Sequence, residues 1–173
     1  GIYTDNNILA TQRLLEAALA AGRPRVVYAW SSSVHGDSPA LPLRESSACH
    51  PVSPYGVTKL AAEHLGRLYE RNHALPVVSL RSFTVYGPRQ RPDMAFHRFL
   101  KAARDTTPIR VFGDGEQTRD FTFVEDIVSA TLAAARTGRP GEVYNVGGGE
   151  RVTLNKVLGL IEEITGRPFD RQR

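Results

Sequence analysis

The chain has 173 residues, of which 41% are hydrophobic, and its formal charge of +4 lies on scattered arginines without the basic stripe that nucleic-acid binding needs. One cysteine excludes an internal disulfide, and five scattered histidines show no metal-ligand spacing, so we expect no metal site. No apolar run reaches transmembrane length and no signal peptide is visible, so we expect a cytoplasmic protein without a membrane partner.

Helical and extended patterns alternate along the chain. The predicted helices cover residues 5–21, 54–73, 94–104, 125–137 and 153–165. The predicted strands cover residues 25–30, 76–83, 109–112, 122–124 and 142–146. Such alternation indicates an α/β fold with a parallel sheet.

Two helices and one connection carry detailed expectations. The first helix has Ile8, Leu15 and Leu19 on one face. The second is predicted to bury an apolar side that consists of Leu60, His64, Leu65, Leu68 and Tyr69. Residues 84–93, with two arginines and two prolines, are predicted to form a functional loop.

A tyrosine and a lysine, Tyr55 and Lys59, stand four residues apart near the start of the second predicted helix. This spacing places both side chains on one face of the helix. A free tyrosine is a poor base at pH 7, because its pKa is about 10, and a nearby cation stabilises a phenolate. The pair therefore suits proton transfer, although an exposed tyrosine and lysine on a surface helix would give the same spacing.

Five sequence blocks resemble, in order, the extended short-chain dehydrogenase/reductase family, and most of all its UDP-glucose and UDP-glucuronate 4-epimerases. The blocks are Val-Val-Tyr-Ala-Trp-Ser-Ser-Ser-Val-His-Gly (26–36), Ser-Pro-Tyr-Gly-Val-Thr-Lys (53–59), residues 80–96, residues 109–127 and Glu-Val-Tyr-Asn-Val-Gly-Gly-Gly (142–149). The resemblance implies an NAD-dependent enzyme of nucleotide sugars that is a homodimer in the full-length context.

For the fold, the resemblance implies part of a Rossmann-like parallel sheet with helices on both faces, followed by part of a small C-terminal substrate-binding region. We expect the first domain to span 1–88 and the second 89–173, with strand 142–146 as a candidate to return to the sheet. The Gly-rich turn that holds the NAD pyrophosphate in this family is not found in these residues. We therefore interpret the chain as the middle and later portion of a longer enzyme.

For catalysis and cofactor binding, the resemblance assigns a role to five residues. Tyr55 is the acid/base, Lys59 stabilises its phenolate and binds the nicotinamide ribose, and Ser31 hydrogen-bonds the sugar hydroxyl that is oxidised. Asn7 braces the active-site helix on the cofactor side, and Ser82 abuts the cofactor. Ordinary polarity at a strand end is the alternative for Ser31, and helix capping or burial is the alternative for Asn7.

For the substrate, the resemblance implies a UDP-sugar. The residues expected to bind it are Ser32, Ser33, Thr84, Arg91, Phe112 and Arg119. Arg119 would hold the diphosphate, since a guanidinium suits phosphate oxygens, and Phe112 would pack on the uracil. A solvated surface position is the alternative for both Arg119 and Arg91, and core packing is the alternative for Phe112.

Three positions depart from the family pattern. Trp30 replaces a small residue, His35 replaces a tyrosine, and Ser82 replaces an aromatic residue. Trp30 and Ser82 could be a large-for-small exchange that keeps the local volume. The predicted function is an NAD-dependent UDP-sugar 4-epimerase, with a nucleotide-sugar dehydratase or decarboxylase, or a non-catalytic remnant or partner-binding subunit, as alternatives.

Overall fold

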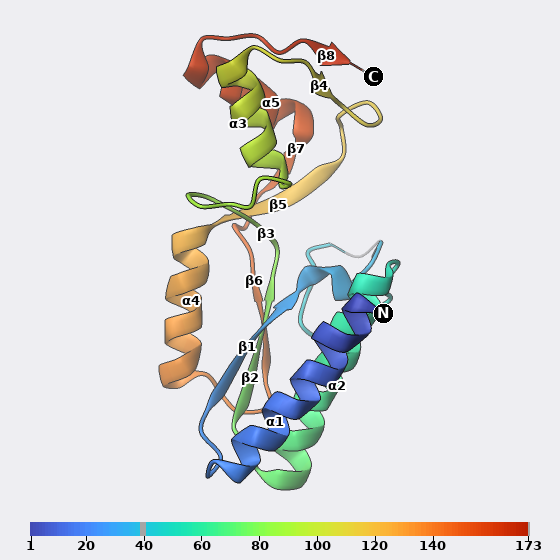
Figure 1. The fold of residues 1–173 in the computed structure, drawn as a ribbon, viewed down its shortest axis with the longest axis vertical. Helices are drawn as coiled ribbons and strands as arrows, with labels where there is room; N and C mark the ends of the chain where they lie inside the picture. Colours follow the sequence, from blue (N-terminus) through green and yellow to red (C-terminus); the bar gives the residue numbers. More distant parts are fainter. Residues whose placement is uncertain (39–40, 173) are drawn as a thin grey trace. The chain divides into compact units, whose positions relative to one another are not determined.

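The computed structural model describes residues 1–38 and 41–172 (Figure 1). The chain forms two compact units: Gly1–Phe83 with Glu125–Val146, and Thr84–Val124 with Gly147–Arg173. The chain therefore enters the second unit at Thr84, and Glu125–Val146 returns to the first unit, which differs from a single boundary at residues 88–89. Within the described residues, no helix has the length and hydropathy that crossing a membrane requires.

A three-stranded parallel sheet forms the centre of the first unit. Its strands are β1 (Val26–Ser31), β2 (Val77–Ser82) and β6 (Val143–Val146), in the order β1-β2-β6. The register runs from Val26 opposite Val77 to Ser31 opposite Ser82. The strand predicted at 142–146 therefore pairs with β2 in this sheet.

Helices cover both faces of this sheet, as expected for a Rossmann-like fold (Figure 1). The π-helical segment η1 (Thr4–Leu9), α1 (Ala10–Ala20) and α2 (Pro54–His73) lie on one face, and α4 (Val124–Thr137) lies on the other. Successive side chains of β2 point to opposite faces of the sheet, so the strand packs against the helices on both faces. Val77 packs with Leu15 of α1, whereas Val78 and Leu80 pack with Ala134 of α4.

Helix α2 has the predicted bounds, but only part of its predicted apolar side packs inward: Leu65 and Tyr69 pack against the core that contains Leu15. The buried residues are Gly56, Thr58, Ala62, Glu63 and Gly66, whereas His64 and Leu68 are exposed. Small residues allow the helix to approach its neighbours closely, and Glu63 is buried because it has a charged partner on β2. The prediction from hydrophobicity alone that His64 and Leu68 are buried is therefore wrong.

The second unit contains a mixed sheet of β3 (Thr84–Tyr86), β5 (Thr118–Phe123) and β7 (Arg151–Thr153). Strand β3 is parallel to β5, and β7 is antiparallel to β5. A short parallel pair, β4 (Ile109–Arg110) and β8 (Arg171–Gln172), lies beside the helices α3 (Ala95–Asp105) and α5 (Leu154–Thr165). Their core includes Ala102, Ile109, Val111 and Leu158.

Three strands of this unit were not predicted. Strand β3 lies inside the segment predicted to be a loop, and β7 and β8 were not assigned. Strands of two or three residues carry too few positions for a hydrophobic period, so pairing with neighbours decides them. The strand predicted at 122–124 is longer, because β5 begins at Thr118.

Candidate active site

The start of α2 places Tyr55 and Lys59 on one face of the helix. Ser53 is the N-cap, and its Oγ accepts a hydrogen bond of 3.0 Å from the backbone N–H of Gly56. Pro54 occupies the first turn, where its missing N–H costs no helical hydrogen bond. One turn further on, the Lys59 Nζ lies 5.7 Å from the centroid of the Tyr55 ring.

The Lys59 ammonium lies among aromatic rings rather than beside a carboxylate. Its Nζ is 5.7 Å from the centroid of the Tyr28 ring and 5.9 Å from that of Trp30. Burial lowers the pKa of Lys59, because removal from water disfavours the charged form. None of the ion pairs or hydrogen bonds found within 1–38 and 41–172 includes the Lys59 side chain.

The serine triplet follows β1 and forms a 3₁₀ turn, Ser32–Val34. Ser31 caps this turn: its Oγ accepts from the Ser33 backbone N–H at 3.2 Å and donates to the Ser33 Oγ at 3.0 Å. The structure therefore gives Ser31 the strand-end role that was its alternative reading. The catalytic role of Ser31 stays a prediction.

Close packing joins the serine turn to the start of α2. A Cβ built at Gly56 would lie 2.7 Å from the Ser33 carbonyl oxygen and 2.9 Å from the Pro51 Cβ. Only glycine allows the helix to lie this close to the turn. Ser33 and Tyr55 are therefore brought together by a contact between backbones.

This contact predicts that Gly56→Ala destabilises the protein by about 1–3 kcal/mol, the usual cost of overpacking. The matched control is Gly159→Ala in α5, where a Cβ meets nothing within 4 Å. That control should be neutral or stabilising by about 0.4–1 kcal/mol. Urea unfolding followed by circular dichroism compares the two, and equal effects would show that the contact is unimportant.

Asn7 joins η1 to α2 through a chain of hydrogen bonds. Its Nδ2 donates to Thr58 Oγ1 at 2.9 Å, and Thr58 Oγ1 donates to the Tyr55 carbonyl oxygen at 2.9 Å. The Asn7 carbonyl accepts from Thr11 Oγ1, which lies 2.7 Å from the Tyr28 hydroxyl. The structure thus joins Asn7 to the helix that carries Tyr55, and the role that the resemblance implies for Asn7 stays a prediction.

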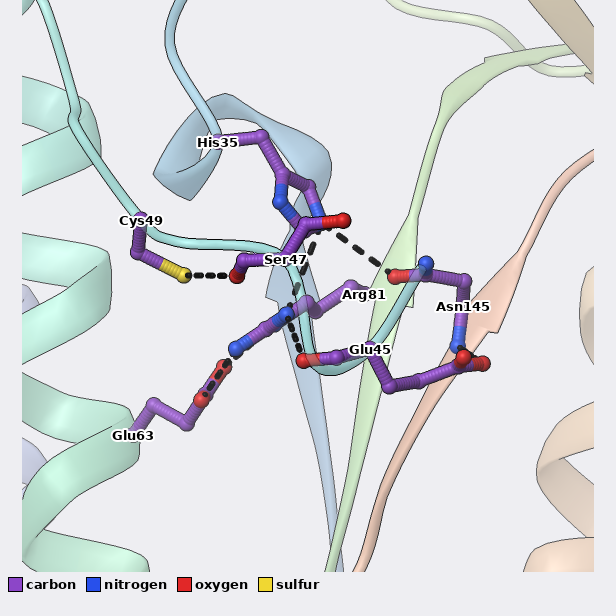
Figure 2. A network of polar contacts seen from close by, with 7 residues as sticks. All are labelled: His35, Glu45, Ser47, Cys49, Glu63, Arg81 and Asn145. Atoms are coloured by element: carbon purple, nitrogen blue, oxygen red, sulfur yellow. Dashed lines mark hydrogen bonds and ion pairs between the residues drawn. The ribbon is translucent and has the colours of Figure 1, made fainter. Parts of the chain in front are cut away.

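A polar network around the buried Arg81 joins β2 to α2 and to the loop after β1 (Figure 2). Arg81 of β2 donates two hydrogen bonds to Glu63 of α2, from Nε at 2.8 Å and from Nη2 at 2.7 Å. Its Nη1 donates to the Glu45 carbonyl oxygen at 3.2 Å. Glu45 in turn accepts from the Asn145 backbone N–H through Oε1. The network thus ties the loop after β1 to α2, β2 and β6.

His35 is fully buried in this network, and burial lowers its pKa while a hydrogen bond to Asn145 opposes the change. Its Nε2 lies 3.4 Å from Asn145 Oδ1 and 3.5 Å from Arg81 Nη1. Since the first neighbour needs a donor and the second an acceptor, one neutral nitrogen can satisfy only one of them. Sequence reasoning noted His35 as a departure but missed Glu63, Glu45 and Asn145.

Trp30 and Ser82 do not compensate for each other in volume. Trp30 is opposite Arg81 in the register, and Ser31 is opposite Ser82. Register partners in a parallel sheet share a face, and successive residues alternate, so Trp30 and Ser82 lie on opposite faces. The suggested large-for-small exchange is therefore wrong.

The predicted substrate residues of the second unit fall on β3, β5 and the segments between them. Thr84, the first residue of β3, is half-buried opposite Phe121. Arg91 is exposed and pairs with Asp93 at 3.1 Å. Arg119 is exposed on β5.

Phe112 is 68% exposed, so the alternative of core packing is wrong. The guanidinium carbon of Arg110 lies 5.1 Å from the centroid of its ring. An exposed ring with a cation on its face is a surface on which a flat heterocycle could stack. In the part of the chain that the structure describes, no group of three potential metal ligands is found.

Comparison with known proteins places this geometry in a family. Residues 1–147 match the model of the NAD dependent epimerase/dehydratase family. The chain is 48% identical over 168 residues to an uncharacterized UDP-glucose epimerase of Bacillus subtilis, covering 95% of this chain and 52% of that protein. It is 38% identical over 174 residues to a UDP-glucuronate 4-epimerase of Thermodesulfobacterium geofontis, covering 99% and 53%.

A solved structure gives the same picture. The crystal structure of UDP-glucuronic acid 4-epimerase from Bacillus cereus, in complex with UDP-glucuronic acid and NAD, superposes with a TM-score of 0.93 at 44% identity. The match covers 98% of this chain and 54% of that chain. The chain thus spans about half the length of the relatives that it matches.

Proposed function

This chain belongs to the NAD dependent epimerase/dehydratase family, and from that premise we propose that the protein is an NAD-dependent 4-epimerase of UDP-sugars. The observation that carries the proposal is the Lys59 ammonium beside the Tyr55 ring, at the helix end against which the serine turn packs. The substrate class follows the relatives whose names and bound ligands are UDP-sugars.

The described residues fit NAD on the nicotinamide side. A lysine ammonium has three donors, and those of Lys59 have no hydrogen-bond partner within the described ranges, so they can reach ribose hydroxyls. We propose that Asn7 acts through Thr58, to which its amide is already bonded. Ser82, half-buried at the end of β2, is proposed to face the cofactor.

In the proposed reaction, Tyr55 takes the proton from the sugar C4 hydroxyl and later returns it to the same oxygen, after the 4-keto sugar has turned so that C4 is reduced on its opposite face. NAD, when bound, accepts the hydride from C4 and gives it back. The Lys59 charge stabilises the phenolate of Tyr55, and Ser31 donates its hydroxyl proton to the sugar oxygen instead of to Ser33 Oγ.

We propose that the second unit binds the nucleotide. Phe112 offers its exposed ring to the uracil, and Arg119 offers its exposed guanidinium to the diphosphate. Ser32, Ser33 and Thr84 are proposed to contact the sugar. Arg91 would first have to leave Asp93.

The test is turnover by the full-length protein of UDP-glucuronate, UDP-glucose, UDP-N-acetylglucosamine and a dTDP-sugar, with products identified by NMR. We expect inversion at C4 of UDP-glucuronate or UDP-glucose, faster than of the N-acetyl sugar. Turnover of the dTDP-sugar alone would contradict the UDP specificity. A 4-keto-6-deoxy product would indicate a dehydratase, loss of CO₂ a decarboxylase, and no turnover with NAD a non-catalytic remnant or partner-binding subunit.

Two further expectations from the resemblance stay predictions. We propose that the full-length protein is a homodimer, which sedimentation velocity at several concentrations would test. We also propose a cytoplasmic location, which fractionation of the source cells would test.

A further inference from the structure

The ammonium of Lys59 is surrounded by aromatic rings. Its Nζ is within 6 Å of three ring centroids, those of Tyr28, Trp30 and Tyr55. The ring of Trp30 is 4% exposed and stacks on that of Tyr28, with centroids 3.9 Å apart and planes inclined by 24°. An ammonium within about 6 Å of a ring face is attracted by the ring, most strongly by tryptophan.

Among residues 1–38 and 41–172, no charged side chain is found that offsets the burial of this ammonium. Burial is the one cause that lowers the pKa of Lys59, and no charged neighbour contributes to it. The titratable groups that face it are the phenols of Tyr28 on β1 and Tyr55 on α2. The side chains from η1 and α1 at this place, Asn7 and Thr11, are neutral.

The indole of Trp30 makes no polar contact that could explain its position. Its Nε1 is buried and has no hydrogen-bond partner among residues 1–38 and 41–172. A change of this side chain therefore removes ring surface and no hydrogen bond. On the side of α2, the Trp30 ring approaches Gly66, whose built Cβ would lie 3.8 Å from Cζ2.

We propose that Trp30 is a positioning residue for Lys59: its indole ring, together with the Tyr28 ring on which it stacks, attracts the ammonium and holds it beside Tyr55 without an acidic partner. A carboxylate at this place would pair with the lysine and compete for its donors. An aromatic face attracts the charge and leaves the donors free. The inference rests on the proposed function for what Lys59 does, while the contact itself can be measured without substrate.

The chain is suited to a direct test, because Trp30 is its only tryptophan and Lys59 is one of three lysines. In the full-length protein with lysine labelled with ¹³C at Cε, the NMR signal that disappears in Lys59→Arg is that of Lys59, and the signals of the exposed Lys101 and Lys156, assigned in the same way, serve as internal references. The Lys59 signal should be displaced by the ring currents and should titrate below the ordinary pKa of a lysine.

Singly and triply fluorinated tryptophan, incorporated at Trp30, weakens the attraction of the ring face with little change in shape. We expect the pKa of Lys59 to fall in steps, by about 0.4–1.5 units in all, while the references stay constant. A Lys59 pKa that is the same with all three indoles would overturn the proposal.

Two variants distinguish the attraction of the aromatic ring from the exclusion of water as the effect of Trp30 on the pKa of Lys59. Trp30→Phe keeps an aromatic face and should change the Lys59 titration little. Trp30→Leu keeps an apolar wall without a face and should lower the pKa of Lys59 and reduce the displacement of its Cε signal. A rise of the pKa in Trp30→Leu would show that the indole only excludes water, and would contradict the proposal.

If Trp30→Leu does not fold, the titration of Lys59 in the fluorinated proteins still tests the proposal. The full-length protein, assayed in parallel with UDP-sugars, tests the proposed function separately. If the full-length protein is inactive but the pKa of Lys59 falls in steps with fluorination, the positioning role of Trp30 is supported and the proposed function is rejected. If the protein is active but the pKa of Lys59 does not change with fluorination, the proposed function is supported and the positioning role is rejected.

Discussion

Replacement of Tyr55 by phenylalanine is expected to lower the turnover of UDP-sugar by the full-length protein by about 10²–10⁴, the usual loss when a general acid–base group is removed. The Tyr55 hydroxyl makes no hydrogen bond within residues 1–38 and 41–172, so the change removes no contact that holds the fold. The ring remains beside Lys59 and edge-on to Tyr3. The loss should therefore fall on kcat and leave the melting temperature unchanged.

The matched control is Tyr69→Phe on the same helix, where the hydroxyl donates to Glu16 Oε1 at 3.3 Å, far along the chain from the proposed site. Steady-state kinetics and thermal melting of both variants make the comparison. Turnover of Tyr55→Phe within threefold of the parent would refute the assignment of Tyr55, and so would an equal loss in Tyr69→Phe.

The largest effect on stability is expected from Arg81→Met. The change leaves Glu63, whose side chain is 1% exposed, buried without its bidentate partner. Breaking a buried pair in this way costs about 3–5 kcal/mol, a large part of the 5–15 kcal/mol that stabilises a typical domain. The guanidinium also holds the Glu45 carbonyl oxygen, so the loop after β1 should loosen as well.

The double variant Arg81→Met with Glu63→Leu should recover part of this loss, because no unpaired charge remains in the interior. Asp105→Asn provides the exposed reference: Arg104 and Asp105 pair at 2.7 Å, but Arg104 is 74% exposed, so water screens the pair and this change should affect stability far less than Arg81→Met. Urea unfolding of the variants gives the free energies. A double variant less stable than Arg81→Met would show that the side chains stabilise by more than their charges.

The sequence by itself predicted the elements with long, regular patterns. Helix α2 runs from Pro54 to His73 as expected, and the five helices and the strands of the parallel sheet lie within a few residues of their predicted positions. A serine followed by proline signals a helix start locally. The spacing of Tyr55 and Lys59 likewise needs only helical geometry to put both on one face, which is why this part of the candidate site was visible before the fold.

The groups that surround Tyr55 and Lys59 could be identified only from the tertiary structure. The partner of Glu63 is 18 residues away on another element, and the rings around Lys59 come from β1 as well as α2. Local periodicity treats a glutamate as exposed and says nothing about pairs between elements. The buried face of α2, the short strands β3, β7 and β8, and the neutral setting of Lys59 therefore depend on long-range packing, which assigns burial by partners rather than by hydrophobicity.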